Sequence, residues 1–387
     1  MTTLRLLHTA DWHLGRWFHG HNLVEDQAHV LDQFVKLALD LRPDAVLIAG
    51  DVYDRMTPPE DAVALLDLVL TRLVVEQRVP VCLIAGNHDS PERINFGGQL
   101  LTASGLTMVG TTRTPAAHLD IDAKNGRCRI HALPYAEPAN VAAVFATGTA
   151  MSHAEAMQRQ LDHVRATHPA DRLSIVVAHA FVQGATESES ERQLCIGGAD
   201  RVPTNTFAGI HYTALGHLHK PQDLADGRVR YSGSLLKYSV SEAPHEKSVT
   251  LVELGKDGSV RTEAHPLSPR RNVRVIEGSL ATLLARAPSE QNRLDYVHAT
   301  LTDAGTVLDP IDRLREHYPN ILGVVRKPPV HEASAAAAAA SRDPQQRTTE
   351  QLFQQFFEHQ TKQPLDRAQT AALYSELQAL QRKKEDA

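Results

Sequence analysis

The chain has 387 residues, of which 42% are hydrophobic and 22% charged, a composition typical of a globular protein with one main domain and smaller additions. No apolar run approaches the roughly 20 residues that span a bilayer, and the first residues lack the pattern of a signal peptide, so we expect a cytoplasmic protein. A formal net charge of −6 gives no general attraction to nucleic acid, so contact with DNA would need local basic patches, metal ions or a partner.

Strands and helices alternate over about the first 265 residues, which predicts a layered α/β domain. Apolar runs predict buried strands at Leu4–Leu7, Ala45–Ala49, Val81–Ala85, Ile175–Ala178 and Tyr212–Leu215. Helical periodicity predicts helices at Asn22–Leu41 and Glu60–Gln77. Three further strands are expected at Val229–Tyr231, Ser248–Glu253 and Ser259–His265, with a hairpin turn at Asp257 and Gly258.

The pattern restarts from Asn272 to Lys327, where strand-like VRVIEG, YVHATL and ILGVVRK alternate with helix-like SLATLLARA and DPIDRLREHY. This order predicts a small separate α/β module. An alanine-rich segment bracketed by prolines follows and is interpreted as a linker. Two amphipathic helices are predicted beyond it, at Thr349–Gln360 and about Asp366–Lys383. They have no core of their own, so they either fold back or dock on another protein, and docking is the preferred interpretation.

Five polar motifs stand at or just beyond the ends of predicted strands. They are Asp11 to His13, Gly50 to Asp54, Gly86 to Asp89, His179, and Gly216 to His219. Polar loops at the carboxyl ends of strands are where sites assemble in α/β folds. Any one histidine is most simply an ordinary hydrogen-bonded side chain, but the ordered set of five motifs favours one shared site.

The residue types in these motifs fit a metal centre. Carboxylates, imidazoles and one amide oxygen, without thiolates, suit divalent metals such as Mn²⁺, Fe²⁺ or Zn²⁺. Two metals roughly 3.5–4 Å apart need a bridging anion, and Asp51 is the natural bridge. Glycines before Asp51 and Asn87 permit sharp turns and close backbone approach. Asp89 is expected to accept hydrogen bonds and not to bind metal, and His8 is expected to lie in the first strand with a structural role.

The ordered motifs resemble the calcineurin-like metallophosphoesterases. The longer segments IAGNHDSPERINF, AHAFVQGATESESER, GGADRVP, ALGHLHKPQ and YSGSLLKYS resemble the SbcD family of bacterial exonucleases, the nuclease subunits of SbcCD complexes, and the resemblance covers nearly the whole chain. It implies a metallophosphoesterase β-sandwich flanked by helices, with a small α/β capping domain and C-terminal helices. The implied parts are a nuclease domain at 1–268, a capping domain at 269–330, a linker at 331–346 and docking helices at 347–387.

The resemblance also implies roles for single residues. One metal would be held by Asp11, His13 and His219, the other by Asn87, His179 and His217, with Asp51 bridging them. The metals are expected to be two Mn²⁺ ions that activate water for in-line attack on phosphorus. His88 would stabilise the transition state or protonate the leaving oxygen, and Asp54 would orient His88.

The implied function is a DNA nuclease, a double-strand exonuclease and hairpin or single-strand endonuclease in DNA repair and recombination. Its partners would be DNA and an SbcC-like ATPase that receives the C-terminal helices, with a homodimer inside a heterotetramer and a cytoplasmic, nucleoid-associated location. A phosphatase is an alternative, because GDVYDR is close to the Ser/Thr phosphatase pattern GDxVDRG, although Met56 and Asp89 depart from phosphatase motifs. A non-catalytic scaffold with this fold is a second alternative, but no ligand position is missing from the set.

Overall fold

The computed structural model describes residues 3–191, 201–305 and 307–327, together with 353–354, 357, 365–366, 369–370 and 373. The chain forms two compact units, Met1–Leu301 with Val307–Val325, and Thr302–Thr306 with Arg326–Ala387. The predicted linker and most of the two predicted C-terminal helices lie outside the described residues, so these predictions and the domain bounds drawn from them stay predictions. In the described part of the chain, none of the helices combines the length and apolar character needed to cross a membrane.

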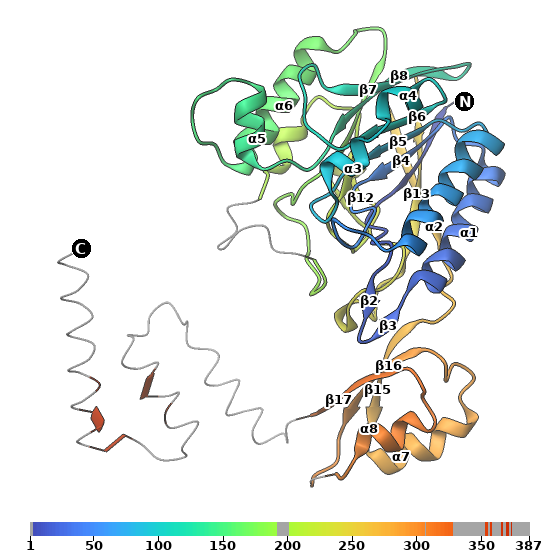
Figure 1. The fold of residues 1–387 in the computed structure, drawn as a ribbon, viewed down its shortest axis with the longest axis vertical. Helices are drawn as coiled ribbons and strands as arrows, with labels where there is room; N and C mark the ends of the chain where they lie inside the picture. The colour runs from blue at the N-terminus through green and yellow to red at the C-terminus, as the bar shows by residue number, and fades with distance from the viewer. Residues whose placement is uncertain are drawn as a thin grey trace. The chain divides into compact units, whose positions relative to one another are not determined.

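The first unit is built on two six-stranded mixed sheets (Figure 1). The first sheet has the order β14-β13-β1-β4-β5-β6. Its strands are β1 (Leu4–Thr9), β4 (Ala45–Ala49), β5 (Val81–Ile84), β6 (Leu106–Val109), β13 (Ser248–Leu254) and β14 (Val260–Pro266). The second sheet has the order β11-β12-β10-β9-β8-β7. Its strands are β7 (Ala117–Ala123), β8 (Gly126–Leu133), β9 (Leu173–His179), β10 (Tyr212–Gly216), β11 (Gln222–Leu224) and β12 (Val229–Tyr231).

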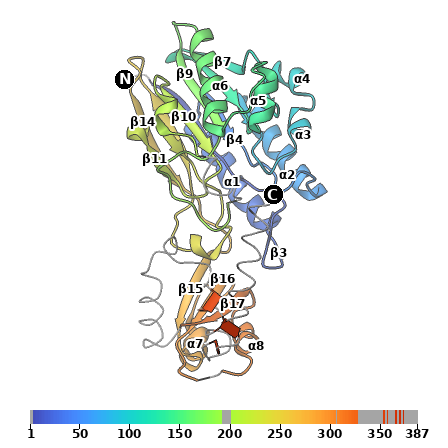
Figure 2. The same ribbon diagram turned by 90° about the vertical axis from the view of Figure 1, so that its left-hand side faces the viewer.

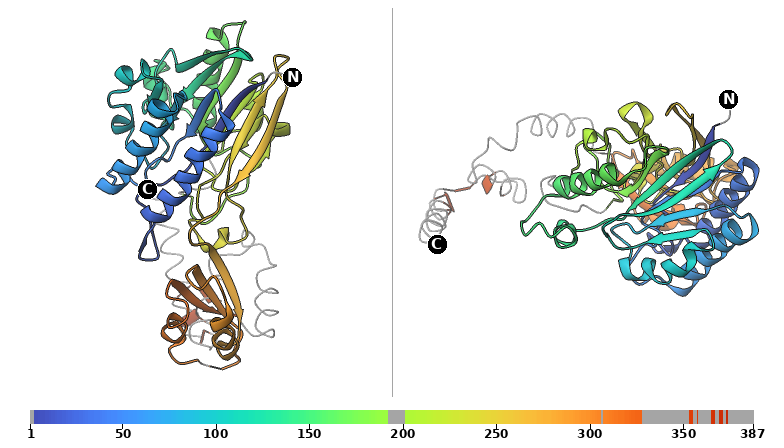
Figure 3. Two further views of the ribbon diagram at one scale, coloured as in Figure 1. Left: turned by 90° about the vertical axis from the view of Figure 1, so that its right-hand side faces the viewer. Right: turned by 90° about the horizontal axis from the view of Figure 1, so that it is seen from above.

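The apolar runs form strands whose residues are buried on both faces of the sheet, as in β4. In β4, Val46 and Ile48 pack in the cluster shared with helices α1 (Val24–Leu41) and α2 (Glu60–Thr71). Ala45 and Leu47 point the other way, into the core between the two sheets. Helix α6 (His153–Thr167) packs on the outer face of the second sheet (Figures 2 and 3). The order of layers is helices, sheet, sheet, helices, which confirms the predicted α/β sandwich.

Every strand and helix predicted in residues 3–327 is present; some, such as β4 and β12, have the predicted ends, and the ends of others are shifted. The helix predicted at Glu60–Gln77 ends at Thr71 and continues as a π-helical turn over Arg72–Glu76. The predicted hairpin joins β13 to β14, where Leu254 pairs with Val260 and Gly258 takes a φ of +78°. Strands β6, β7, β8 and β11 and the helices α3 (Pro91–Asn95), α4 (Gly98–Thr102), α5 (Pro138–Val144) and α6 were not predicted. A short hairpin of β2 (Trp17–Phe18) and β3 (His21–Asn22) was also missed.

The predicted small module is confirmed in its order of elements. It consists of β15 (Val273–Gly278), α7 (Leu280–Arg286), β16 (Tyr296–Leu301), α8 (Pro310–Arg315) and β17 (Ile321–Arg326). The three strands form one sheet in the order β15-β16-β17, with β15 and β16 parallel. A separate core that includes Leu283, Val297 and Leu314 holds the module together.

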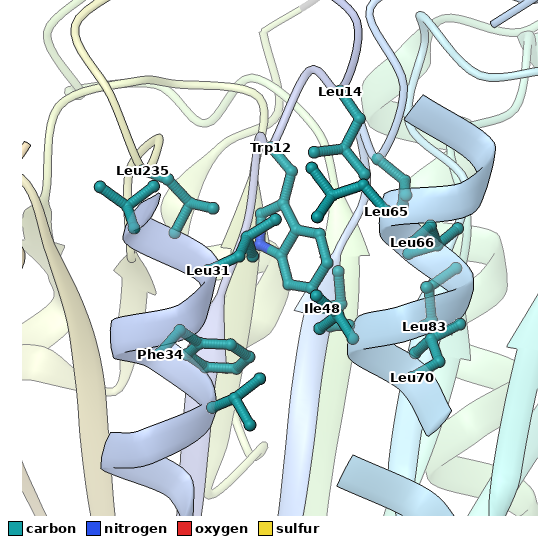
Figure 4. Packing of buried hydrophobic residues seen from close by; sticks show 14 of the residues in the cluster. Trp12, Leu14, Leu31, Phe34, Ile48, Leu65, Leu66, Leu70, Leu83 and Leu235 are labelled. Atoms are coloured by element: carbon teal, nitrogen blue, oxygen red, sulfur yellow. The ribbon is translucent and has the colours of Figure 1, made fainter. Parts of the chain in front are cut away.

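Trp12 anchors the loop after β1 to the main core (Figure 4). Its indole is fully buried beside Leu31 and Ile48 and meets the ring of Phe34 edge to face, with the ring centroids 5.8 Å apart. Its Nε1 donates to Oγ1 of Thr9 over 2.9 Å. The residues on either side of Trp12 are two of the predicted metal ligands, so core packing of one side chain fixes the position of both.

Candidate metal centre

The predicted site residues follow five strands that end close together. Asp11 and His13 follow β1, Asp51 follows β4, and Asn87 and His88 follow β5, three neighbouring strands of the first sheet. The remaining ligands come from the neighbouring strands β9 and β10 of the second sheet; they are His179, His217 and His219. The structure brings all seven predicted ligands together at this end of the sandwich.

The backbone carries unusual torsion angles at four of the seven ligands. The φ angles are +53° at Asp11, +46° at His13, +47° at Asp51 and +108° at His217. Positive φ is unfavourable for residues with a side chain and persists where the surroundings enforce it, often at functional sites. Here the peptide nitrogens of Asp11 and His13 donate to the carbonyls of Gly50 and Asp51, at 3.0 and 2.9 Å.

Three glycines allow the ligand loops to approach closely. A Cβ at Gly86 would lie 2.1 Å from Oδ1 of Asp51, and a Cβ at Gly50 would lie 2.4 Å from Nδ1 of His179. A Cβ at Gly216 would lie 1.9 Å from the carbonyl oxygen of Ala49. The glycines before Asp51, Asn87 and His217 are therefore required by space, and Gly50, with a φ of +90°, is required by turn geometry as well.

One group of ligands consists of Asp11, His13 and His219, whose candidate ligand atoms all lie within 4.8 Å of one another. Nε2 of His13 faces Nε2 of His219 at 3.1 Å. Oδ1 of Asp11 accepts a hydrogen bond from the peptide nitrogen of His217, whereas Oδ2 is buried and has no hydrogen-bond partner. The free oxygen and the two facing nitrogens are arranged as donors to a common centre.

A second group is centred on Oδ1 of Asn87. Nε2 of His179 lies 2.9 Å from this oxygen and Nδ1 of His217 lies 3.1 Å from it. Oδ2 of Asp51 lies between the groups, 3.6 Å from Nε2 of His13 and 3.5 Å from Nε2 of His179. The geometry matches two positions that share one carboxylate.

The electrostatics of the site favour a bound cation. Burial, then the charge of Asp51, raises the pKa of Asp11 well above its usual value. Burial also acts to raise the pKa of Asp51, but electrostatic interaction with protonated His179 and His13 outweighs burial and holds that pKa below its usual range. Burial and the charge of Asp51 disfavour ionisation of Asp11, and a cation beside the two carboxylates would offset this.

The imidazoles are in the form that binds metals. Burial lowers the pKa of His13 and of His217 to about 3, and it also lowers the pKa of His179 and of His219. A neutral imidazole keeps one nitrogen lone pair for a ligand. His179 shows which nitrogen this is, because its Nδ1 lies 2.9 Å from the carbonyl of Ala49, which can only accept a hydrogen bond.

The donor set therefore fits two divalent cations. In the described part of the chain, three groups of carboxylates and imidazoles have the spacing of a metal site, and all three lie in this centre. All the donors are oxygen or nitrogen atoms, which suit borderline or hard divalent metals. The ligand Asn87 and the neighbouring His88 are half-buried, while the other six ligands are buried, so the centre opens to solvent on the side of Asn87 and His88.

His88 lies beside the centre, and Asp54 contacts it in a way that differs from the expected one. Nδ1 of His88 is bonded to the backbone carbonyl of Asp54 at 2.9 Å, not to its carboxylate. The Asp54 carboxylate lies 2.9 Å from Nη1 of Arg16 and 3.5 Å from Nδ1 of His13. The backbone of Asp54 therefore orients His88, and its side chain supports His13 and Arg16.

Asp89 holds three loop nitrogens. Its carboxylate accepts from the peptide nitrogens of Val52, Tyr53 and Gly86 at 3.1, 2.9 and 2.8 Å. Burial, then the charge of Asp51, raises the pKa of Asp89 to about 7. The residue supports the loops after β4 and β5 through hydrogen bonds, as expected from its sequence context.

Several supporting residues were not singled out from the sequence. On α1, Gln27 is buried, and its Nε2 donates to the carbonyls of Trp12 and His13 at 3.1 and 2.7 Å. The hydroxyl of Tyr238 donates to the carbonyl of Trp12 at 2.5 Å. Four more supporting residues contact His219: Ser190, Glu191, Glu242 and Lys247. A single glutamine in a helix, such as Gln27, cannot be recognised from the sequence as a supporting residue. The polar residues clustered in ATESESER and KYSVSEAPHEK are a weak indication that these two segments lie near a site.

Two family models and two solved structures are similar to parts of this chain. A family model described as calcineurin-like phosphoesterase matches residues 4–221. A second model, SbcD_C, described as the type 5 capsule protein repressor C-terminal domain, matches residues 269–361. The crystal structure of TT1561 of Thermus thermophilus is 14% identical, covers 68% of this chain and 99% of its own, and has a TM-score of 0.39. A dimetal phosphatase from Danio rerio is also 14% identical, covers 68% of this chain and 96% of its own, and has a TM-score of 0.43.

Proposed function

The chain belongs to the calcineurin-like phosphoesterase family as an SbcD-like member, and on this premise we propose that it is a metal-dependent DNA nuclease. Membership of the family implies hydrolysis of phosphoesters with divalent metals. The observation that favours DNA over a small phosphate ester is the SbcD-type C-terminal domain, which follows a complete set of ligand residues in the same chain.

In the proposed centre, Asp11, His13 and His219 hold one cation and Asn87, His179 and His217 hold the other. Asp51 is shared, which fits its position between His13 and His179. Bound divalent cations lower the pKa of water to near neutral and offset charge on the phosphoryl oxygens. We propose Mn²⁺ as the cation, and the oxygen and nitrogen donors are compatible with it.

His88 is proposed to stabilise the charged transition state or to protonate the leaving oxygen. Its Nδ1 carries a proton, because the Asp54 carbonyl bonded to it can only accept. Nε2 is therefore the atom left to exchange a proton or to stabilise charge on the substrate. His88 is half-buried on the open side of the centre, where a phosphodiester can reach it.

The proposed biological setting is DNA repair and recombination, in a complex with an SbcC-like ATPase that receives the C-terminal helices. The net charge of −6 supports this arrangement, since a subunit with little general attraction to DNA depends on a partner for part of its grip. The proposed assembly contains two copies of this chain and two of the ATPase, in the cytoplasm at the nucleoid.

The test compares substrates on the full chain after chelator treatment and return of Mn²⁺. We expect cleavage of linear duplex and hairpin DNA, faster when the ATPase is present, and little hydrolysis of p-nitrophenyl phosphate. Rapid hydrolysis of p-nitrophenyl phosphate without DNA cleavage would instead identify a phosphatase. Absence of both activities in metal-loaded protein, with and without the ATPase, would indicate a non-catalytic scaffold.

A further inference from the structure

His219 is held from three sides by residues that do not belong to the predicted ligand set. Its peptide nitrogen donates to Oε1 of Glu191 at 2.8 Å, and its carbonyl accepts from Nζ of Lys247 at 2.7 Å. Its ring nitrogen Nδ1 lies 2.6 Å from Oγ of Ser190. The other ring nitrogen, Nε2, faces His13 in the metal centre. The ring is therefore fixed in place, with one nitrogen directed at the centre and one at Ser190.

Ser190 is in turn bonded to a buried ion pair. Its hydroxyl donates to Oε1 of Glu242 at 2.5 Å, and Oε2 of Glu242 accepts from Nζ of Lys247 at 2.5 Å. Glu242 is fully buried and Lys247 is 6% exposed. An ionised carboxylate can only accept hydrogen bonds, and the ammonium group of Lys247 stabilises this form.

The direction of the hydrogen bonds follows from counting protons. The hydroxyl of Ser190 has one proton, and Glu242 takes it. The oxygen of Ser190 can then only accept from Nδ1 of His219, so the imidazole proton lies on Nδ1. A neutral imidazole with its proton on Nδ1 presents the lone pair of Nε2, the nitrogen that faces the centre.

We propose that the buried Lys247–Glu242 pair, acting through Ser190, fixes His219 in the tautomer whose Nε2 is free to bind metal. The proposal rests on the metal centre described above and makes Ser190, Glu242 and Lys247 positioning residues. His179 reaches the same tautomer through a backbone carbonyl, which no substitution removes. The tautomer of His219 depends on side chains, and single substitutions can therefore test it.

A purely structural role for the pair is the competing explanation. Lys247 also donates to Oγ of Ser234, and Glu242 accepts from the peptide nitrogen of Tyr238, so both residues tie the segment after β12 together. A structural role predicts that substitutions change stability in proportion to lost bonds. The proposed hydrogen-bond relay, which runs from the Lys247–Glu242 pair through Ser190 to His219, predicts a different result. Substitutions in it should change the protonation site of the His219 imidazole and the affinity of the protein for metal.

The first measurement is histidine ¹⁵N NMR on the metal-free protein, with the His219 signal identified by its loss in His219→Gln. We expect the wild-type spectrum to show the proton of His219 on Nδ1. A wild-type spectrum with the proton on Nε2 would overturn the proposal without any relay variant being made.

The second measurement is calorimetric titration of the metal-free protein with Mn²⁺. Second-layer partners of metal-bound histidines typically contribute about 10- to 100-fold in metal affinity, so Ser190→Ala is expected to weaken Mn²⁺ binding by that order. Ser190→Thr retains the hydroxyl and is expected to stay close to wild type. Glu242→Gln replaces an acceptor oxygen by a donor amide and is expected to weaken binding as well.

Ser188→Ala is the matched control, because it removes a hydroxyl from the same loop without changing a contact to His219. It is expected to bind Mn²⁺ as wild type does. If folded Ser190→Ala kept both the Nδ1 proton and wild-type affinity, or if Ser190→Thr lost affinity as much as Ser190→Ala, the relay would be refuted. Neither measurement uses DNA, so a wild-type protein that binds Mn²⁺ but fails to cut DNA would refute only the proposed nuclease function.

Discussion

The peptide nitrogen of His217 donates a 2.9 Å hydrogen bond to Oδ1 of Asp11, across 206 residues of sequence and between the two sheets. This bond takes one carboxylate oxygen of Asp11 and leaves Oδ2 buried without a partner. A buried oxygen without a partner is costly unless something binds it. The pair therefore joins the two halves of the sandwich and reserves one oxygen for a cation.

The substitution Asp11→Asn distinguishes the two roles of Asp11, which are hydrogen bonding to His217 and binding of a cation. The amide oxygen can still accept from His217, so we expect the fold to persist, while the loss of charge weakens binding of the metal at that position. The measurement is Mn²⁺ binding by calorimetry alongside thermal unfolding. Asp120→Asn makes the same chemical change in a half-buried pair with Arg129, away from the centre, and should leave Mn²⁺ binding unchanged. Wild-type metal binding by Asp11→Asn would contradict the ligand assignment.

His88→Ala is expected to lower DNA cleavage by about 10²- to 10⁴-fold, the range typical of a lost general acid or base. Metal binding should remain, because His88 is not among the seven proposed ligands. Single-turnover cleavage at saturating Mn²⁺ measures the effect. The matched control is His153→Ala, which removes an imidazole at the start of α6. Full activity of metal-loaded His88→Ala would refute a catalytic role for this residue.

Gly86→Ala tests the close approach of two ligand loops. The added methyl would lie 2.1 Å from Oδ1 of Asp51, so the loops must separate. We expect a loss of about 1–3 kcal/mol in the free energy of unfolding, typical of an overpacked site, together with weaker Mn²⁺ binding. Gly305 has open space around its Cβ position, so Gly305→Ala should change stability by less than about 0.5 kcal/mol. Urea unfolding of both variants measures the two changes in the free energy of unfolding. Equal losses in Gly86→Ala and Gly305→Ala would contradict the steric argument.

His8 is expected to make the free energy of unfolding fall as the pH is lowered. It lies between the sheets, with Nδ1 2.9 Å from the hydroxyl of Tyr212 and Nε2 3.2 Å from the carbonyl of Leu215. Burial, reinforced by the charge of Arg230, lowers the pKa of His8 to about 3. As the pH falls from about 6.5 toward 3, the unfolded chain binds a proton that the folded chain does not, so stability is lost by up to about 1.4 kcal/mol per pH unit.

His8→Gln removes this contribution, so its pH slope between about pH 4 and 6 should be shallower than that of wild type by up to about 1.4 kcal/mol per pH unit. The free energy of unfolding at each pH, from urea titrations, gives both slopes. His29→Gln on the exposed side of α1 serves as the control and should keep the wild-type slope. Identical slopes in His8→Gln and wild type would show that His8 is not held neutral by the fold.

The ligand loops could be predicted from the sequence because of how their strands are buried. Strands such as β4 lie between a helical layer and a second sheet, so they appear as unbroken apolar runs whose ends are marked by Gly and Asp. The hairpin of β7 and β8 was missed because its outer residues are charged. There, Asp120 pairs with Arg129 and Asp122 with Arg127, which masks the strand pattern.

The supporting side chains could not be predicted because their partners are far away in the sequence. From the sequence, Lys247 is indistinguishable from an ordinary surface lysine. In the structure its Nζ donates a 2.7 Å hydrogen bond to the carbonyl of His219. Ser190 and Glu242 are separated by 52 residues, and only the folded chain brings them together. The position of Asp54 shows the same limit, since its motif placed it beside His88 but did not show that the backbone carbonyl makes the contact.

The most direct test of the dinuclear centre is the number of Mn²⁺ ions bound per chain. Chelator-treated full-length protein is titrated with Mn²⁺, and free Mn²⁺ is followed by electron paramagnetic resonance. Two bound ions per chain are predicted, and the loss of at least one in Asp51→Asn, because Asp51 lies between His13 and His179. Binding of no ion or a single ion by folded wild-type protein would contradict a two-metal centre.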